Sequence, residues 1–239
     1  TAFAVGAEEL KILHGAAPMR SWAPETLLDL SPQARLLFEQ VYHDDPLFQM
    51  AGAQALELSA SDMGGMAGGD EGPGKMRGLD ELTDFTAARL LEETRIAAFS
   101  MPGWDTHRAQ ERALPKSLQG LERVILRLRE QLGAAVWGKT TLLAMTEFGR
   151  TARENGSGGT DHGTAGVMLV AGGAVRGGQV LGRWPGLADL YEGRDLLPTS
   201  DVRAWAAHAM RGLYGLDRAV LERSVFPGLQ MGDDPGLLR

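Results

Sequence analysis

Short apolar runs alternate with an amphipathic helix in the centre of this chain, and this alternation restricts its fold more than any other feature. Residues 95–100, 140–145 and 166–171 are each typical of a short buried strand. Between the first two runs, Ser117 is expected to cap a helix that Gly133 ends, with apolar residues at spacings of three and four: Leu118, Leu121, Ile125, Leu128 and Leu132. Strands joined by a helix through short connections favour a right-handed crossover. The pattern therefore predicts an α/β fold, a three-layer α/β/α sandwich with a mostly parallel sheet.

Further helices are expected on both sides of a glycine-rich segment. Ser31 and Pro32 are typical of a helix start, and a second helix is predicted over residues 46–58. Residues 60–78 are rich in Gly, Met and Asp, which predicts a flexible loop, either an apolar lid over a cleft or a plain connector. A third helix is expected over residues 79–93.

Chain length and composition favour one globular domain over residues 1–239, with a loose tail at 229–239. The chain has 239 residues and 44% hydrophobic content, which is enough for a single sizeable core. It opens at Thr1 without a basic and apolar leader, so we expect a cropped or processed product. The longest apolar run, residues 167–175, is interrupted by glycines and is too short to span a membrane.

Charge and cysteine content narrow the possible partners. The net charge is −7, and acidic and basic residues are interspersed, which argues against a nucleic-acid or anionic-membrane surface. A small molecule or a protein is the expected partner. The chain contains no cysteine, so it has no disulfides, and only His, Asp, Glu and carbonyl oxygens are available to hold a metal.

Carboxylates and imidazoles follow the predicted strands at three places. They are Asp105 and His107 after the first strand, Glu147 after the second, and Asp161 with His162 beyond a glycine-rich connector. Parallel α/β sheets bind ligands beyond the carboxyl ends of their strands, so we expect these five side chains to converge. Such a set suits a divalent metal, Zn²⁺ or Mn²⁺, which would polarise an ester oxygen or generate hydroxide.

The carboxylates and Arg150 each have a second interpretation. Glu147 is either a functional carboxylate or the partner of a nearby arginine, Arg150 or Arg153. Asp161 is either a ligand or an Asx-turn residue that shapes the loop. Arg150 either holds an anionic substrate oxygen through its planar guanidinium or forms a surface salt bridge.

The residues at 105–107 have alternatives too. Asp105 is either a ligand or the N-cap of a helix that opens at Thr106, and His107 would then be a polar surface residue in its first turn. His162 lies between polar and glycine residues, which favours a ligand. The remaining histidines are expected to be structural: His14, His43 and His208.

Several long strings resemble the bacterial family called domain of unknown function 1501, and the resemblance covers most of residues 79–215. The strings are residues 103–107 (GWDTH), 146–151 (TEFGRT), 158–164 (GGTDHGT), 172–178 (GGAVRGG) and 184–187 (WPGL). That family is related to alkaline phosphatases and sulfatases, whose α/β/α fold carries one or two metals and a nucleophile at the strand ends. The likeness implies that Asp105 and His107 form one ligand pair, that Glu147 replaces a strand-end Asp, and that Asp161 and His162 match a late His motif.

The chain also departs from that family. A glycine-rich first strand with an aspartate, and a following stretch with Arg, Ser and His where a nucleophile would lie, do not occur in residues 1–60. The chain thus looks like the carboxyl-terminal part of a family member without its first strand or strands, and no catalytic nucleophile is assigned.

Two functions follow from the resemblance and the departures. The first is a metal-dependent hydrolase of small anionic phosphate or sulfate esters. The alternative is a non-catalytic binding or scaffold module, or an inactive fragment. Family members commonly carry export signals, which implies a periplasmic location.

Overall fold

The computed structural model describes residues 2–5, 19–22 and 73–239 of the chain. The helices predicted at Ser31 and over 46–58, and the loop over 60–72, lie outside the described residues. The chain divides into two compact units, Thr1–Ser100 and Met101–Arg239, which are described separately. The expectation of one domain over residues 1–239 stays a prediction.

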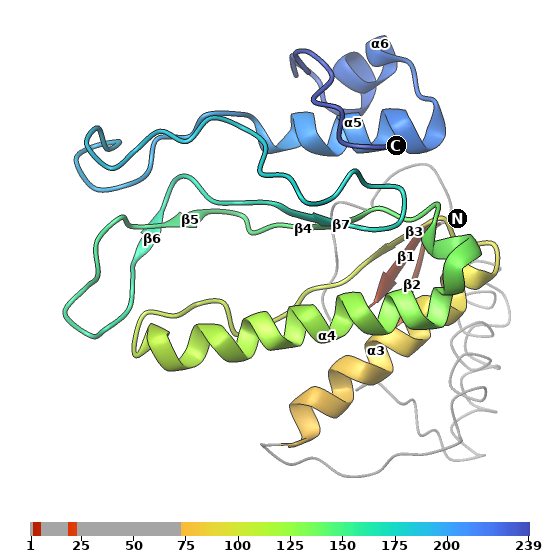
Figure 1. Ribbon diagram of the computed structural model, residues 1–239, viewed down its shortest axis with the longest axis horizontal. Coiled ribbons are helices and arrows are strands. Elements are labelled where there is room, and N and C mark those ends of the chain that lie inside the picture. Colours follow the sequence, from red (N-terminus) through yellow and green to blue (C-terminus); the bar gives the residue numbers. More distant parts are fainter. Residues whose placement is uncertain (1, 6–18, 23–72) are drawn as a thin grey trace, which may run out of the picture. The chain divides into compact units, whose positions relative to one another are not determined.

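The first unit holds a three-stranded parallel sheet in the order β2-β1-β3 (Figure 1). Its strands are β1 (Ala2–Val5), β2 (Met19–Trp22) and β3 (Ile96–Ala98), and Ala2 pairs with both Met19 and Ile96. The central strand is apolar and its last three residues are buried, as expected for a strand covered on both faces. The strand predicted over 95–100 is confirmed as β3.

Helix α3 (Pro73–Leu91) belongs to the same unit and starts earlier than the predicted helix over 79–93. Residues 73–78, expected in the loop, are therefore helical, because Pro73 at the first helical position already has the φ angle that a helix needs. The small core contains Leu82 and Phe85 of this helix with Phe3 of β1, and the two phenylalanine rings pack edge to face at 5.3 Å.

The second unit begins with a long helix, α4 (Gln110–Trp137). The predicted start at Ser117 is wrong, because Ser117 lies inside the helix and its hydroxyl donates to the carbonyl of Gly103 at 2.7 Å. Gly133 does interrupt the helix, with φ 63° and ψ 172°. The buried face is centred on Val124, and the predicted face residue Leu118 is 49% exposed.

An antiparallel ribbon follows α4. Strand β4 (Leu142–Ala144) pairs with β7 (Leu169–Ala171), and between them β5 (Gly149–Arg150) pairs with β6 (His162–Gly163). Both strand positions are confirmed, but the expected parallel pairing is wrong for this part of the chain. The physical reason is the connection, since residues 145–168 fold back on themselves without the crossover helix that parallel neighbours need.

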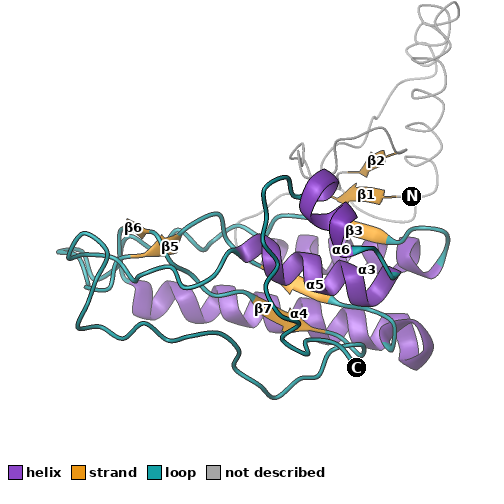
Figure 2. Cartoon of the chain, turned by 90° about the horizontal axis from the view of Figure 1, so that it is seen from above, coloured by secondary structure: helices purple, strands orange, loops and turns teal. Residues whose placement is uncertain are grey.

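The described fold is thus mixed α/β with a small parallel sheet. Within the second unit, α4 and α5 (Val202–Tyr214) lie on opposite sides of β4 and β7 in Figure 1. Figure 2 shows α4, α5 and β7 overlapping in the view from above. The β5–β6 pair extends this ribbon toward the end where α4 begins (Figure 1). No helix among the described residues is long and apolar enough to cross a membrane.

The C-terminal part of the second unit packs on α5. After it come α6 (Arg218–Val220) and a π-helical turn, η2 (Leu221–Val225). Ala207 of α5 and Leu221 of η2 form one buried apolar cluster with Leu229 and Met231. The segment 229–239, predicted to be loose, contributes buried residues to the structure: Leu229, Met231 and Leu237. His208 is buried as expected for a structural histidine, with its Nε2 atom 3.0 Å from the carbonyl of Met231.

Candidate metal centre

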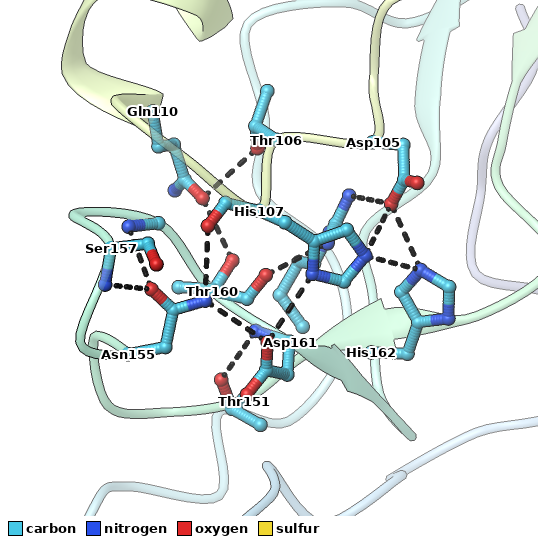
Figure 3. Close-up of polar contacts among 12 residues, drawn as sticks. Asp105, Thr106, His107, Gln110, Thr151, Asn155, Ser157, Thr160, Asp161 and His162 are labelled. Carbon is cyan, nitrogen blue, oxygen red and sulfur yellow. Dashed lines mark hydrogen bonds and ion pairs between the residues drawn. The ribbon is translucent and has the colours of Figure 1, made fainter.

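The site lies where the tip of the ribbon meets the loop before α4. His162 is the first residue of β6, Asp161 precedes it, and Asp105 and His107 come from the loop (Figure 3). In the β5–β6 ladder Arg150 pairs directly with His162. The ribbon folds back against the loop, so Asp105 contacts Arg150, 45 positions later in the chain, and His162, 57 positions later.

Asp105, His107 and His162, here called the trio, form a compact triangle of possible ligand atoms. Asp105 Oδ1 lies 2.8 Å from His107 Nε2 and 2.9 Å from His162 Nε2, and the two Nε2 atoms are 3.0 Å apart. The three side chains are 65%, 38% and 49% exposed, so solvent reaches them. One carboxylate oxygen and two imidazole nitrogens at this spacing are close enough together to hold a metal ion.

Arg150 connects the segments that carry the trio. Its Nη2 atom donates to the carbonyl of Trp104 at 2.7 Å and to Asp105 Oδ1 at 2.9 Å, and its Nη1 atom donates to the carbonyl of Thr160 at 2.9 Å. Hydrogen bonds from His162 and then Arg150 hold the pKa of Asp105 below its usual value, so this carboxyl is an anion at neutral pH. The salt bridge expected as one alternative for Arg150 is observed, and a contact with substrate stays a prediction.

Asp161 lies at the Nδ1 atom of His107, whereas Asp105 and His162 lie at its Nε2 atom. The Oδ1 atom of Asp161 is 3.2 Å from His107 Nδ1 and accepts a hydrogen bond from Asn155 Nδ2 at 3.0 Å. These two contacts, chiefly the one from Asn155, lower the pKa of Asp161. Its backbone is fixed against Thr151, whose N–H donates to the carbonyl of Asp161 at 2.9 Å.

Glu147 is exposed and is not part of the group whose ligand atoms lie within 4.8 Å of one another. Its predicted role as a ligand stays a prediction, and Arg150, one of its two suggested partners, pairs with Asp105 instead. The next residue, Phe148, does reach the site, with its ring 4.1 Å from the ring of His162 at an interplanar angle of 32°. Sequence reasoning missed this aromatic contact.

Asp105 does not cap a helix, contrary to the alternative considered for it. Helix α4 begins at Gln110 after Ala109, which has φ 44° and offers no side-chain cap. His107 accordingly lies in the loop and not in a first helical turn. Both side chains are thereby available to the trio.

Asn155 and Gln110 hold the two segments together, and the sequence did not single out either. Asn155 Nδ2 donates to the carbonyl of His107 at 3.0 Å, and its Oδ1 accepts from the backbone N–H groups of Ser157 and Gly159. Gln110 Oε1 accepts from the hydroxyls of Thr106 at 3.0 Å and Thr160 at 2.7 Å. The Asn-Gly-Ser sequence at 155–157 was the available signal, since Asn often bonds the backbone two residues ahead in a turn.

Two glycines of the connector allow backbones to approach closely. A Cβ atom on Gly159 would collide with the backbone of His107, and one on Gly163 would collide with the backbone of Arg150. The absence of side chains at these positions lets the segment that carries Asp161 and His162 pass close to the backbones of His107 and Arg150. Gly159 and Gly163 therefore provide room for a close backbone contact.

Comparison with known proteins gives one match. Residues 30–212 match the family model described as Protein of unknown function (DUF1501). Neither the curated proteins nor the solved structures contain a match.

Proposed function

The chain belongs to the family described as Protein of unknown function (DUF1501), and from that premise we propose that it is a metal-dependent hydrolase of phosphate or sulfate esters. The observation that carries the proposal is the trio, with one carboxylate oxygen and two imidazole nitrogens 2.8–3.0 Å apart and open to solvent. The likeness to alkaline phosphatases and sulfatases, with their three-layer sandwich, is part of the proposal, as is the periplasmic location.

In this proposal Asp105, His107 and His162 hold one divalent ion. When bound, such an ion lowers the pKa of a coordinated water and polarises an ester oxygen. The chain's own residues prepare the site. Asp105 supplies a negative charge, and Arg150 orients its carboxylate and places a positive charge beside the position that an anionic ester would occupy.

Water is the proposed nucleophile, because the hydroxyl groups around the trio are engaged elsewhere. Thr106 and Thr160 donate to Gln110, and Thr151 donates to the carbonyl of Arg153 at 2.9 Å. A side-chain nucleophile is therefore not assigned to these residues. The exposure of the trio leaves room for both water and a small ester.

A non-catalytic binding or scaffold module, or an inactive fragment, is the second candidate. Arg150 supports it, because two of its three hydrogen bonds go to backbone carbonyls and connect the ribbon to the loop. On this interpretation the polar cluster only orders the tip of the ribbon.

Metal analysis and the variant Asp105→Ala separate the two candidates. We expect protein purified without chelator to hold about one Zn or Mn per chain and to hydrolyse an aryl phosphate or aryl sulfate. Asp105→Ala should lower Zn²⁺ affinity by more than about 100-fold, because loss of a ligand exceeds the effect of losing an outer partner. Asp189→Ala, an exposed aspartate elsewhere in the second unit, is the matched control.

A metal-free protein whose thermal stability ignores added Zn²⁺ would contradict the hydrolase proposal, since a ligand that binds only the folded state must stabilise it. Metal binding without hydrolysis of either ester would favour the binding module.

A further inference from the structure

We infer that Asp161 is a positioning residue that acts through His107 and is not itself a ligand of the proposed ion. The inference rests on the proposed metal centre and deepens it. It changes the role expected for Asp161, which the sequence suggested as a member of the ligand set.

The two nitrogens of the His107 ring face different partners. Nδ1 lies 3.2 Å from Asp161 Oδ1, whereas Nε2 lies 2.8 Å from Asp105 Oδ1 and 3.0 Å from His162 Nε2. The two nitrogens of an imidazole point in different directions, so a group at Nδ1 and a group at Nε2 cannot lie at the same place. Asp105, and not Asp161, is the carboxylate that shares the Nε2 side.

Both nitrogens of His107 face a carboxylate, Asp105 at Nε2 and Asp161 at Nδ1, so a bound ion would select the tautomer. An ionised carboxylate only accepts hydrogen bonds, and in neutral imidazole one nitrogen donates while the other carries a lone pair. An ion held by the trio would take the lone pair of His107 Nε2, so the proton of the neutral ring would lie on Nδ1 and would be donated to Asp161 Oδ1. Histidine ligands of metals commonly donate their other N–H to a carboxylate in this way.

Asn155 fixes this arrangement from the other side. Its Nδ2 group donates to Asp161 Oδ1 and to the carbonyl of His107, each at 3.0 Å (Figure 3). The Asn155 amide therefore fixes the position of the Asp161 carboxylate relative to the backbone of His107. An Asx-turn role, in which Asp161 only shapes its own loop, would not require a contact with a histidine fifty-four positions earlier.

Zn²⁺ titration of the full chain tests the inference. Asp161→Ala should weaken Zn²⁺ binding about 10- to 100-fold with an unchanged stoichiometry. Asp161→Asn keeps an oxygen that accepts from Nδ1–H, so it should recover most of the affinity, whereas Asp105→Asn should not. In the Zn²⁺-loaded wild type, NMR of labelled histidine should show the His107 Nδ1–H protected from exchange, and Asp161→Ala should lose that protection.

Thermal unfolding of each variant without metal, with Asp189→Ala as the matched control, shows whether the fold is retained. If Asp161→Asn loses as much affinity as Asp105→Asn, Asp161 is a direct ligand and the inference is wrong. Wild-type affinity in Asp161→Ala, or a zinc-bound Nδ1 in His107, would also overturn it. A wild type that binds no Zn²⁺ would instead remove the proposed centre itself, which distinguishes the two failures.

Discussion

The ribbon tip and the C-terminal helical region are stabilised in opposite ways, although both belong to the second unit. At the tip, Asp105 and His162 are 65% and 49% exposed and are held by hydrogen bonds and ion pairs. In the C-terminal region, Ala207 and Leu221 are fully buried among apolar neighbours. The difference indicates that burial supports the scaffold, whereas the tip keeps its polar atoms accessible and depends on directional contacts.

The largest expected effect tests the apolar side of this comparison. Leu221→Ala removes a side chain with 0% exposure and should cost about 2–5 kcal/mol of unfolding free energy. Chemical denaturation followed by circular dichroism measures the loss. Zn²⁺ affinity under native conditions should stay within about twofold, since the two sites share no partners and distant sites behave independently. A parallel loss of affinity would show that the two regions are coupled.

Gly159→Ala tests the polar side. The new methyl group would collide with the backbone of His107 and displace it, while the apolar cluster of the C-terminal region is untouched. We expect ester hydrolysis to fall about 100-fold, the effect typical of a displacement of about 1 Å at a reactive site. Gly156→Ala, in the same connector with open space around it, is the matched control. Equal activities of the two variants would mean that close backbone approach is not required.

The smallest effect concerns Asp201, whose carboxylate caps α5 by accepting from the backbone N–H of Arg203 at 2.9 Å. Asp201→Ala should cost about 0.5–2 kcal/mol near neutral pH. A side-chain hydrogen bond from Arg203 holds the pKa of Asp201 below its usual 3.8, so the folded state binds this proton less readily than the unfolded state. The stabilisation is therefore present above pH 3.8 and is lost as the pH falls through the lower folded pKa.

Unfolding curves of wild type and Asp201→Ala should accordingly converge in acid. Asp234→Ala, which removes a carboxylate whose contact lies outside any helix, is the control. If the stability difference between wild type and Asp201→Ala persists unchanged below the folded pKa of Asp201, the effect comes from helix propensity and not from the ionised cap.

Local sequence patterns predicted β3, β4 and β7 but missed β1, β2, β5 and β6, and they predicted the wrong pairing for β4 and β7. The apolar runs at 140–145 and 166–171 contain β4 and β7, although these strands are half-buried or exposed and not buried as predicted. The same pattern does not distinguish a parallel from an antiparallel neighbour, which depends on the connection between them. The start of α4 was missed because Ala109 precedes it without a capping side chain, so Ser117 was the first visible signal.

The candidate site was predicted by residue type but not by arrangement. Asp105, His107 and His162 meet as expected, since paired carboxylates and imidazoles in glycine-rich loops are a local signal. Which nitrogen of His107 faces Asp161 is a property of the folded ribbon, and no spacing along the chain encodes it. The sequence did not single out Asn155 and Gln110, because amide side chains are common in ordinary turns.

The bond from Arg150 to the carbonyl of Trp104 has a consequence for mutational tolerance. Every amino acid presents the same carbonyl, so this anchor makes no demand on the identity of residue 104, and many substitutions there would leave it intact. Arg150 has no such latitude, because a lysine ammonium does not reproduce the planar donor pattern that reaches three acceptors at once. Substitution of Arg150 should therefore be more damaging than substitution of Trp104, although the two residues form the two ends of one hydrogen bond.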